Sequence, residues 1–230
     1  MSHLYTIKSI SNLQSNPLLK HFSVDKLQVL QDQFATKTGV ASLIIHPDGL
    51  PITKPSNFSR LCQLIRSTER GNANCMKSDA MIGKSDSHGP IIQPCLSGGL
   101  WDSGASIYHQ NSHVASWLIG QVFNEAQVQK LDKMMLYGHT IGANMEEFSY
   151  AISFATVMSQ HKFTCLSNIL FVFNKQLSAF ISGDGEQSLA ENRQQLASLI
   201  EQHTTFSPLY EVWEQMHRFY EQSRVLRQIA

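Results

Sequence analysis

Three of the chain's four cysteines, Cys62, Cys75 and Cys95, lie in one stretch between Pro55 and Gln121. A cysteine thiol can bind a metal ion, form a disulfide on oxidation, or line an apolar pocket as a small hydrophobic side chain. Three thiols in one stretch therefore indicate a functional site in which they have one of these three roles. We expect the three cysteines to line a pocket for a small ligand.

A metal ion or an iron–sulfur cluster is the second alternative for the same cysteines. Their spacing, C-x12-C-x19-C, lacks the C-x-x-C pair of many zinc sites and is a poor signal for zinc. Asp79 or His88 would be the candidate fourth ligand. Beyond a metal ion or an iron–sulfur cluster at the three cysteines, the sequence does not identify a cofactor.

A redox switch and an enzyme with a cysteine nucleophile are the remaining alternatives. A redox switch needs an accessible thiol of low pKa, and Arg66, one helical turn after Cys62, would stabilise a thiolate there. A nucleophilic cysteine needs a base, and none is evident near these residues. We therefore expect a protein that is not an enzyme.

Other residues of this stretch are candidates for contact with a ligand. Gln121 stands in an otherwise apolar strand and needs a hydrogen-bond partner if it is buried. Asn57 is expected to cap a helix and is also a binding candidate, while Phe58 and Trp101 are the nearest aromatic side chains. Cys165 is expected to belong to the core. The full set of predicted ligand-binding residues is Asn57, Phe58, Cys62, Arg66, Cys75, Cys95, Trp101 and Gln121.

The elements that position these residues alternate between strands and helices. Apolar runs and turn residues predict strands at 40–45, 50–53, 90–95, 100–108 and 113–123, and helices at 57–67 and about 73–83, separated at Gly71. This order predicts an α+β fold, in which an antiparallel sheet carries two helices inserted between strands 2 and 3. A concavity between sheet and helices would hold the ligand.

The flanking segments are predicted to be helical. Residues 1–22 form an arm or short helix, and a helix capped by Ser23 ends at Gly39. We predict one domain over 23–182, with a sheet-containing core to about residue 124 and a helical part from 125. A linker at 182–186 and a helical extension over 183–230 follow. The predicted helices of this region span 125–137, 146–156, 162–181, 187–202 and 209–228.

The composition excludes several classes of protein. The 230 residues carry no net charge, only 16% of them are charged, and no basic run is present, so direct binding to nucleic acid is not expected. The first residues do not resemble a signal peptide, and the most apolar helical window is too short to span a bilayer. We expect a cytoplasmic protein with free thiols and no membrane contact, and a homodimer through the C-terminal helices is one option for its assembly.

Four short motifs resemble the PocR sensory domain over roughly residues 25–182. They are the run from Lys54 to Gly71, Cys75 with Ser78-Asp79, Cys95 with Gly99-Leu100, and Ile119-Gly-Gln-Val122. The resemblance implies a PAS-like module of bacterial and archaeal regulators that binds small hydrocarbon derivatives such as diols, with Cys62, Cys75 and Cys95 at the family's cysteine positions. Leu96 stands where family members often have histidine after the third cysteine.

The resemblance also defines the expected function. Such domains act in transcription regulation or signal transduction, often joined to an AraC-type DNA-binding domain. No such helix-turn-helix follows in residues 187–230, so we expect a small-molecule sensor whose signal leaves through its C-terminal helices or a partner.

Overall fold

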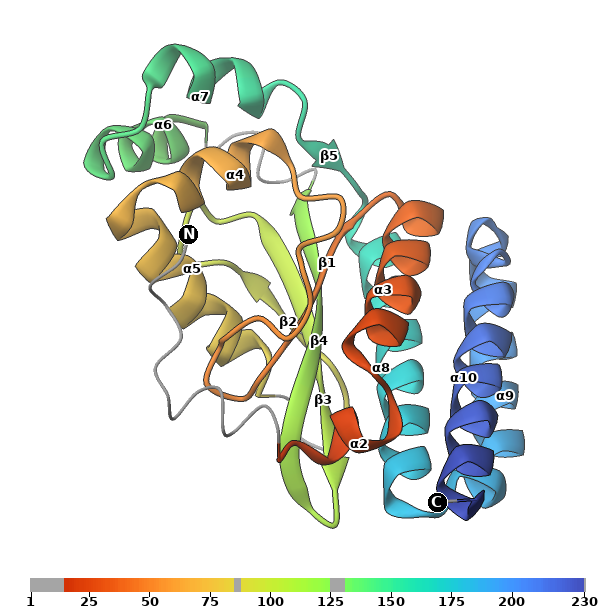
Figure 1. Ribbon diagram of the computed structural model, residues 1–230. Helices are drawn as coiled ribbons and strands as arrows, with labels where there is room; N and C mark the ends of the chain where they lie inside the picture. Colours follow the sequence, from red (N-terminus) through yellow and green to blue (C-terminus); the bar gives the residue numbers. More distant parts are fainter. Residues whose placement is uncertain (1–14, 85–87, 125–130, 230) are drawn as a thin grey trace.

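The fold is built on an antiparallel sheet, as the sequence predicts. The computed structural model describes residues 15–84, 88–124 and 131–229. The strands β1 (Ala41–Ile45), β2 (Ile91–Pro94), β3 (Trp101–His109) and β4 (Ser112–Phe123) lie in the order β1-β4-β3-β2 (Figure 1). A fifth short strand, β5 (Thr156–Val157), pairs in parallel with the end of β4 at Val122 and Phe123. The α+β prediction is confirmed.

Helices cover both faces of this sheet. On one face lie α3 (Val24–Thr38) and α8 (Gln160–Ser182), with α9 (Gly185–Gln202) and α10 (Leu209–Ile229) behind them (Figure 1). On the other face lie α4 (Arg60–Ser67) and α5 (Glu69–Ile82), which we call the lid. Two outer helices, α6 (Leu131–Thr140) and α7 (Met145–Ile152), lie beyond α4. The described residues also include the short helical segments α2 (Pro17–His21) and η2 (Thr204–Phe206).

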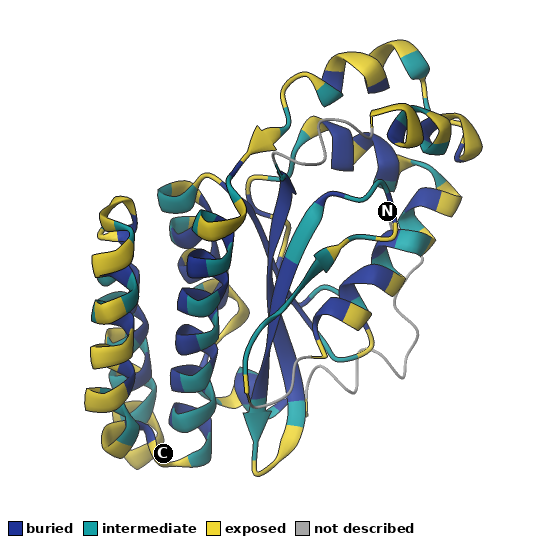
Figure 2. Cartoon of the chain, turned by 180° about the vertical axis from the view of Figure 1, so that it is seen from behind, coloured by how far each residue is buried: buried dark blue, intermediate teal, exposed yellow. Residues whose placement is uncertain are grey.

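Alternation along the strands divides the sheet residues between the two faces. Ile44 and Trp117 point to the helical layer, where the Trp117 ring meets Phe34 and Phe173 at centroid distances of 5.3 and 6.1 Å. Leu43 and Leu118 point the opposite way, toward the lid. Burying an aromatic or aliphatic side chain of this size stabilises the fold by roughly 1.5–3 kcal/mol, so the helical layer holds most of the stabilising apolar contacts. Figure 2 shows the buried residues along the sheet and the inward faces of the helices.

The helix before β1 begins and ends where the sequence predicts. The Ser23 hydroxyl accepts a hydrogen bond from Lys26 N at 3.3 Å, and Gly39 ends the helix with a left-handed φ of 74°. Asn16 and Pro17 start the short helix α2 as its cap and first residue, within the predicted N-terminal arm or short helix. The rest of the predicted N-terminal arm lies outside the described residues.

The predicted strand at 50–53 does not form. The segment pairs with β1 through an isolated bridge at Ile45–Pro51 and a hydrogen bond from Ile52 N to Ile44 O at 2.9 Å, and a second isolated bridge, Ser42–Ser56, lies just beyond it. Pro51 has no backbone N–H to donate to a strand ladder. The fully buried Gln31 of α3 takes over part of that role, since its side chain accepts from Ile44 N at 2.8 Å and donates to Lys54 O at 2.7 Å.

Gly71 does not separate the two lid helices, contrary to the prediction. The break falls at Thr68, whose hydroxyl caps α5 by accepting from Gly71 N at 3.1 Å. A Cβ at Gly71 would overlap the Ile65 carbonyl group. The glycine therefore allows α4 and α5 to approach each other closely. This packing role cannot be read from the sequence around Gly71.

The C-terminal extension packs onto α8 and α3 of the helical layer. The predicted linker at 182–186 shrinks to Gly183 and Asp184, because α9 already begins at Gly185. Trp213 of α10 meets Phe173 of α8 at 5.3 Å, within the same core as Trp117. The apolar side chains on one face of α10 are therefore buried within the chain. No helix of the described part of the chain combines the length and apolar character needed to cross a bilayer.

Candidate functional site

A β-bulge in β4 shapes the site. Trp101 pairs with Val122 and Ser103 with Ile119, so two residues of β4, Gly120 and Gln121, face the single residue Asp102 of β3. Gln121 takes a left-handed φ of 63°, and its N–H donates to Asp102 Oδ1 at 2.7 Å. A Cβ at Gly120 would overlap that carboxylate and lie 2.7 Å from Asp102 Cα. The bulge therefore holds the Asp102 side chain against the sheet.

The lid is tied to the sheet at both ends. At its start, Ser59 N donates to Gln121 Oε1 at 2.8 Å, which places α4 beside the bulge. At its end, the Gly83 carbonyl accepts hydrogen bonds from Ser106 and Ser116 of the sheet, at 2.7 and 2.8 Å. Gln121 is buried, and its predicted need for a partner is met by Ser59 N.

A cavity lies between the lid and the sheet. Its walls come from β1, Phe58, the two lid helices, the loop between β2 and β3, and the bulge region of β3 and β4. It offers about 40 Å³ to the centres of water-sized molecules, inside a hollow of about 520 Å³ that includes its open mouth. Since one water needs roughly 10–15 Å³ by this measure, the enclosed part has room for about three waters or a similarly small molecule.

The three predicted cysteines line this cavity. Cys62 comes from α4, Cys75 from α5, and Cys95 from the loop directly after β2. Burial raises the pKa of each thiol, and for Cys75 the nearby Arg66 offsets only part of the rise. All are free thiols held in the protonated form, which does not favour the redox-switch alternative.

Arg66 pairs with an aspartate, whereas the redox-switch hypothesis placed it beside a thiolate. Its Nη2 donates to Asp79 Oδ2 at 2.6 Å, and its guanidinium lies 5.1 Å from the centroid of the Phe58 ring. Burial by itself would lower the pKa of Arg66, but the Asp79 carboxylate raises it. Burial raises the pKa of Asp79, and Arg66 offsets part of that rise. The cavity is thus lined by an ion pair in which the two opposite charges neutralise each other.

Two polar atoms of the cavity wall have no hydrogen-bond partner among the described residues. They are Arg66 Nε and Ser97 Oγ, both buried. The hydroxyl of Ser97 lies near Cys75, whose sulfur is only a weak acceptor. Buried polar groups are nearly always paired, so both atoms indicate a polar ligand or water in the cavity.

Sequence reasoning missed Asp102, the other carboxylate of the cavity. Burial raises its pKa to about 7, and the hydrogen bond from Gln121 N offsets only part of the rise. A carboxylate inside a predicted strand was the available signal. Ser78 was also missed; it lines the cavity, and its hydroxyl accepts from Leu96 N at 3.1 Å.

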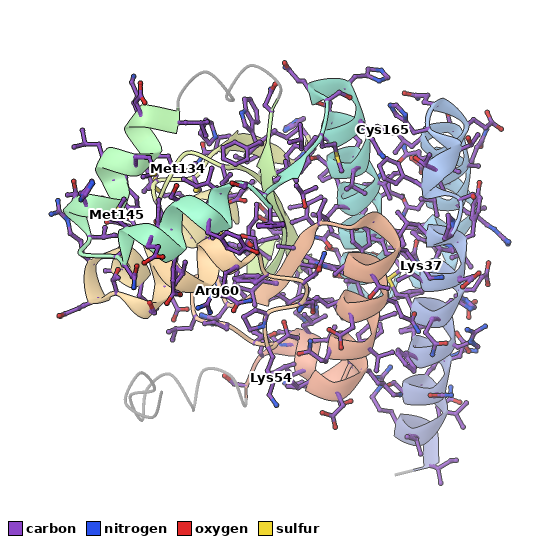
Figure 3. The ribbon with its side chains drawn as sticks, turned by 90° about the horizontal axis from the view of Figure 1, so that it is seen from above. Lys37, Lys54, Arg60, Met134, Met145 and Cys165 are labelled. Atoms are coloured by element: carbon purple, nitrogen blue, oxygen red, sulfur yellow. The ribbon has the colours of Figure 1, made fainter. Side chains whose placement is uncertain are left out.

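The remaining predicted residues lie elsewhere. Asn57 is exposed, and its side chain donates to Val40 O at 3.3 Å; Ser59, not Asn57, caps α4. Trp101 packs against the helical layer on the opposite face of the sheet. Of the proposed fourth metal ligands, Asp79 lines the cavity, whereas His88 is exposed and does not. Cys165 lies on α8 as predicted, where its thiol contacts Leu199 O at 3.3 Å (Figure 3).

The outer helices cover the lid from outside. Met134 of α6 and Phe148 of α7 share a buried cluster with Cys62 and Cys75. An exposed ion pair of 2.6 Å between Arg60 and Glu147 also joins α4 to α7. Figure 3 shows Met134 and Met145 on this side of the molecule, away from Cys165. The cysteines thus lie between the cavity and a second apolar layer.

A metal ion is the second class of ligand expected for the three cysteines. Within residues 15–84, 88–124 and 131–229, no group of three His, Cys, Asp or Glu side chains is placed to hold one. Metal binding needs deprotonated thiols, and burial favours the protonated form here.

Comparison with known proteins agrees with the resemblance. The family described as "Sensory domain found in PocR" matches residues 20–180, which include every residue of the cavity wall. No curated protein and no solved structure matches the chain. A match over more than half of the 230 residues establishes the family. The chain belongs to the PocR sensory domain family.

Proposed function

We propose that this protein is a cytoplasmic, PAS-like sensor that binds a small hydroxylated hydrocarbon derivative, such as a diol, in the cavity between lid and sheet. The observation that carries the proposal is the pair of buried polar atoms without partners, Arg66 Nε and Ser97 Oγ, in an otherwise largely apolar wall. Membership of a sensory family supports the same function.

The size and chemistry of the cavity fit such a ligand. About 40 Å³ for water-sized centres suits a molecule of a few heavy atoms. Arg66 Nε would donate to a ligand oxygen, and the Ser97 hydroxyl can donate or accept. Leu43, Ile82 and the three protonated thiols would contact the hydrocarbon part.

The signal would leave through α8. Asn174 of α8 donates to Ala105 O at 2.5 Å, and Tyr108 N of β3 donates to Ser178 Oγ at 2.9 Å. A ligand that favours one arrangement of the bulge shifts β3, and these bonds couple β3 to α8 and its partners α9 and α10. The exposed end of α10, with Val225, Leu226 and Ile229, would serve an output partner or a second copy of the chain.

A matched pair of serine variants tests the ligand site. Ser97 and Ser103 both carry a buried hydroxyl without a partner among the described residues, but only Ser97 lines the cavity. Isothermal titration with propane-1,2-diol should give saturable binding to the wild type. Ser97→Ala should weaken it about tenfold, the equivalent of one hydrogen bond, and Ser103→Ala should not. Equal affinity for all three proteins would refute the site.

A metal or iron–sulfur centre is the second candidate, because Cys62, Cys75 and Cys95 all line one cavity. Elemental analysis of protein purified without oxygen tests it. Stoichiometric zinc or iron that is lost in the three Cys→Ser variants, with folding retained, would favour this function over ligand binding.

A further inference from the structure

The charges around the cavity are not balanced. Two carboxylates, Asp79 and Asp102, and one guanidinium, Arg66, line it; among the described residues no lysine or histidine does. The 2.6 Å ion pair between Arg66 and Asp79 neutralises the cation. Asp102 is left as the carboxylate without a cationic partner of its own.

Asp102 cannot easily turn away from the cavity. One carboxylate oxygen accepts from Gln121 N at 2.7 Å, and the bulge at Gly120 approaches the same side chain so closely that no Cβ would fit. Gln121 is in turn fixed to the start of the lid by its bond from Ser59 N. The position of the charge is therefore set by the backbone of β4 and not by a flexible side chain.

An anionic ligand in this cavity would meet a fixed carboxylate and a cation already paired. Arg66 alone would suggest a carboxylate ligand, but its salt bridge removes the charge that would attract one. The free Nε can still donate one hydrogen bond to a neutral oxygen. A hydroxyl group suits both sides of the cavity, because it can accept from Arg66 and donate to Asp102.

We infer that Asp102 is a specificity-determining residue, which makes the cavity reject small carboxylates and accept uncharged hydroxylated molecules of the same size. The inference rests on the proposed function, since it assigns the charge class of the ligand bound at that site. Two like charges about 5 Å apart in surroundings of intermediate polarity repel strongly enough to weaken binding on the order of 100-fold.

Three probes of nearly equal size separate charge from shape. Propane-1,2-diol is uncharged, lactate carries a carboxylate, and 1-aminopropan-2-ol carries an ammonium group. Calorimetric titration at pH 8.5, where Asp102 is ionised, should show the diol binding about 100-fold more tightly than lactate. The amino alcohol should bind at least as tightly as the diol.

Removing the charge should remove the discrimination. Asp102→Asn keeps the acceptor oxygen for Gln121 N, and it should bring lactate within about tenfold of the diol and weaken the amino alcohol. Asp102→Ser, which also lacks the charge, serves the same purpose if the Asn variant does not fold. Asp184→Asn, at an exposed residue whose side chain does not cap α9, is the matched control and should keep the wild-type ranking.

The outcomes distinguish this inference from the proposed function. If the wild type binds diol and lactate equally, or if both Asp102 variants keep the wild-type ratio, the cavity binds ligands but Asp102 does not select their charge, and the inference is overturned. If no probe binds to the wild type, the proposed function fails and the inference with it.

Discussion

Asp102 should make the stability of the protein depend on pH. Its pKa rises from the ordinary 3.8 to about 7 in the fold, so between these values the folded protein holds a proton that the unfolded chain releases. With respect to this group, stability is therefore greatest below about pH 4 and falls as the pH rises through about 7. One unit of pKa corresponds to about 1.36 kcal/mol, which sets an upper limit of about 4 kcal/mol. Because water in the open cavity solvates the charge, we expect about 2 kcal/mol.

Asp102→Asn isolates this contribution. Urea unfolding followed by the fluorescence of the buried Trp117 and Trp213 gives the free energy of unfolding between pH 4 and 8.5. The variant should match the wild type near pH 4 and exceed it by about 2 kcal/mol at pH 8.5. The control Asp184→Asn should follow the wild-type curve. Parallel curves for the wild type and Asp102→Asn, or a variant less stable at pH 8.5, would refute the reasoning.

Three further changes test packing and coupling. Gly104→Ala would place a Cβ 2.5 Å from the Ile82 carbonyl oxygen of α5 and should lower the free energy of chemical unfolding by about 3 kcal/mol. Gly89→Ala, whose Cβ would meet nothing within 4 Å, should change it little, and equal losses in the two variants would contradict this account. Arg66→Ala leaves Asp79 buried without its partner and should lower the unfolding free energy by about 3 kcal/mol, and adding Asp79→Asn should restore part of it; no recovery in the double variant would argue against the pair. Asn174→Ala removes the hydrogen bond to Ala105 O of β3, so it should lower the free energy of unfolding by about 1–2 kcal/mol and speed amide exchange in β3. Unchanged exchange in β3 would exclude α8 as the route of coupling.

Local sequence signals predicted most of the strands and helices and the inward-facing side chain of Cys62. The apolar spacing of Leu61, Cys62 and Ile65 places Cys62 on the buried face of its helix, and the structure confirms this. Ser23 and Gly39 mark the ends of α3 because capping depends only on neighbouring residues. The antiparallel sheet and the buried face of α4 followed from such signals.

Residues whose role depends on distant partners were not predictable in this way. The importance of Asp102 comes from a bulge on another strand, and strand periodicity does not show where a bulge will fall. Gln31 replaces hydrogen bonds of a strand that fails to form, which is visible only once α3 lies beside β1. Trp101 was predicted near the thiols because it is near them in sequence, yet pleating turns it to the opposite face.

The shared core of α8 and the last two helices limits how the molecule can be divided. Residues 20–180 match the family, but α8 is covered on one side by Leu196, Trp213 and Met216. Excising the matched segment alone would expose Phe173 and its neighbours to water and favour aggregation. Biosensors or chimeric receptors made from this protein should therefore keep α9 and α10 and join the reporter after residue 229.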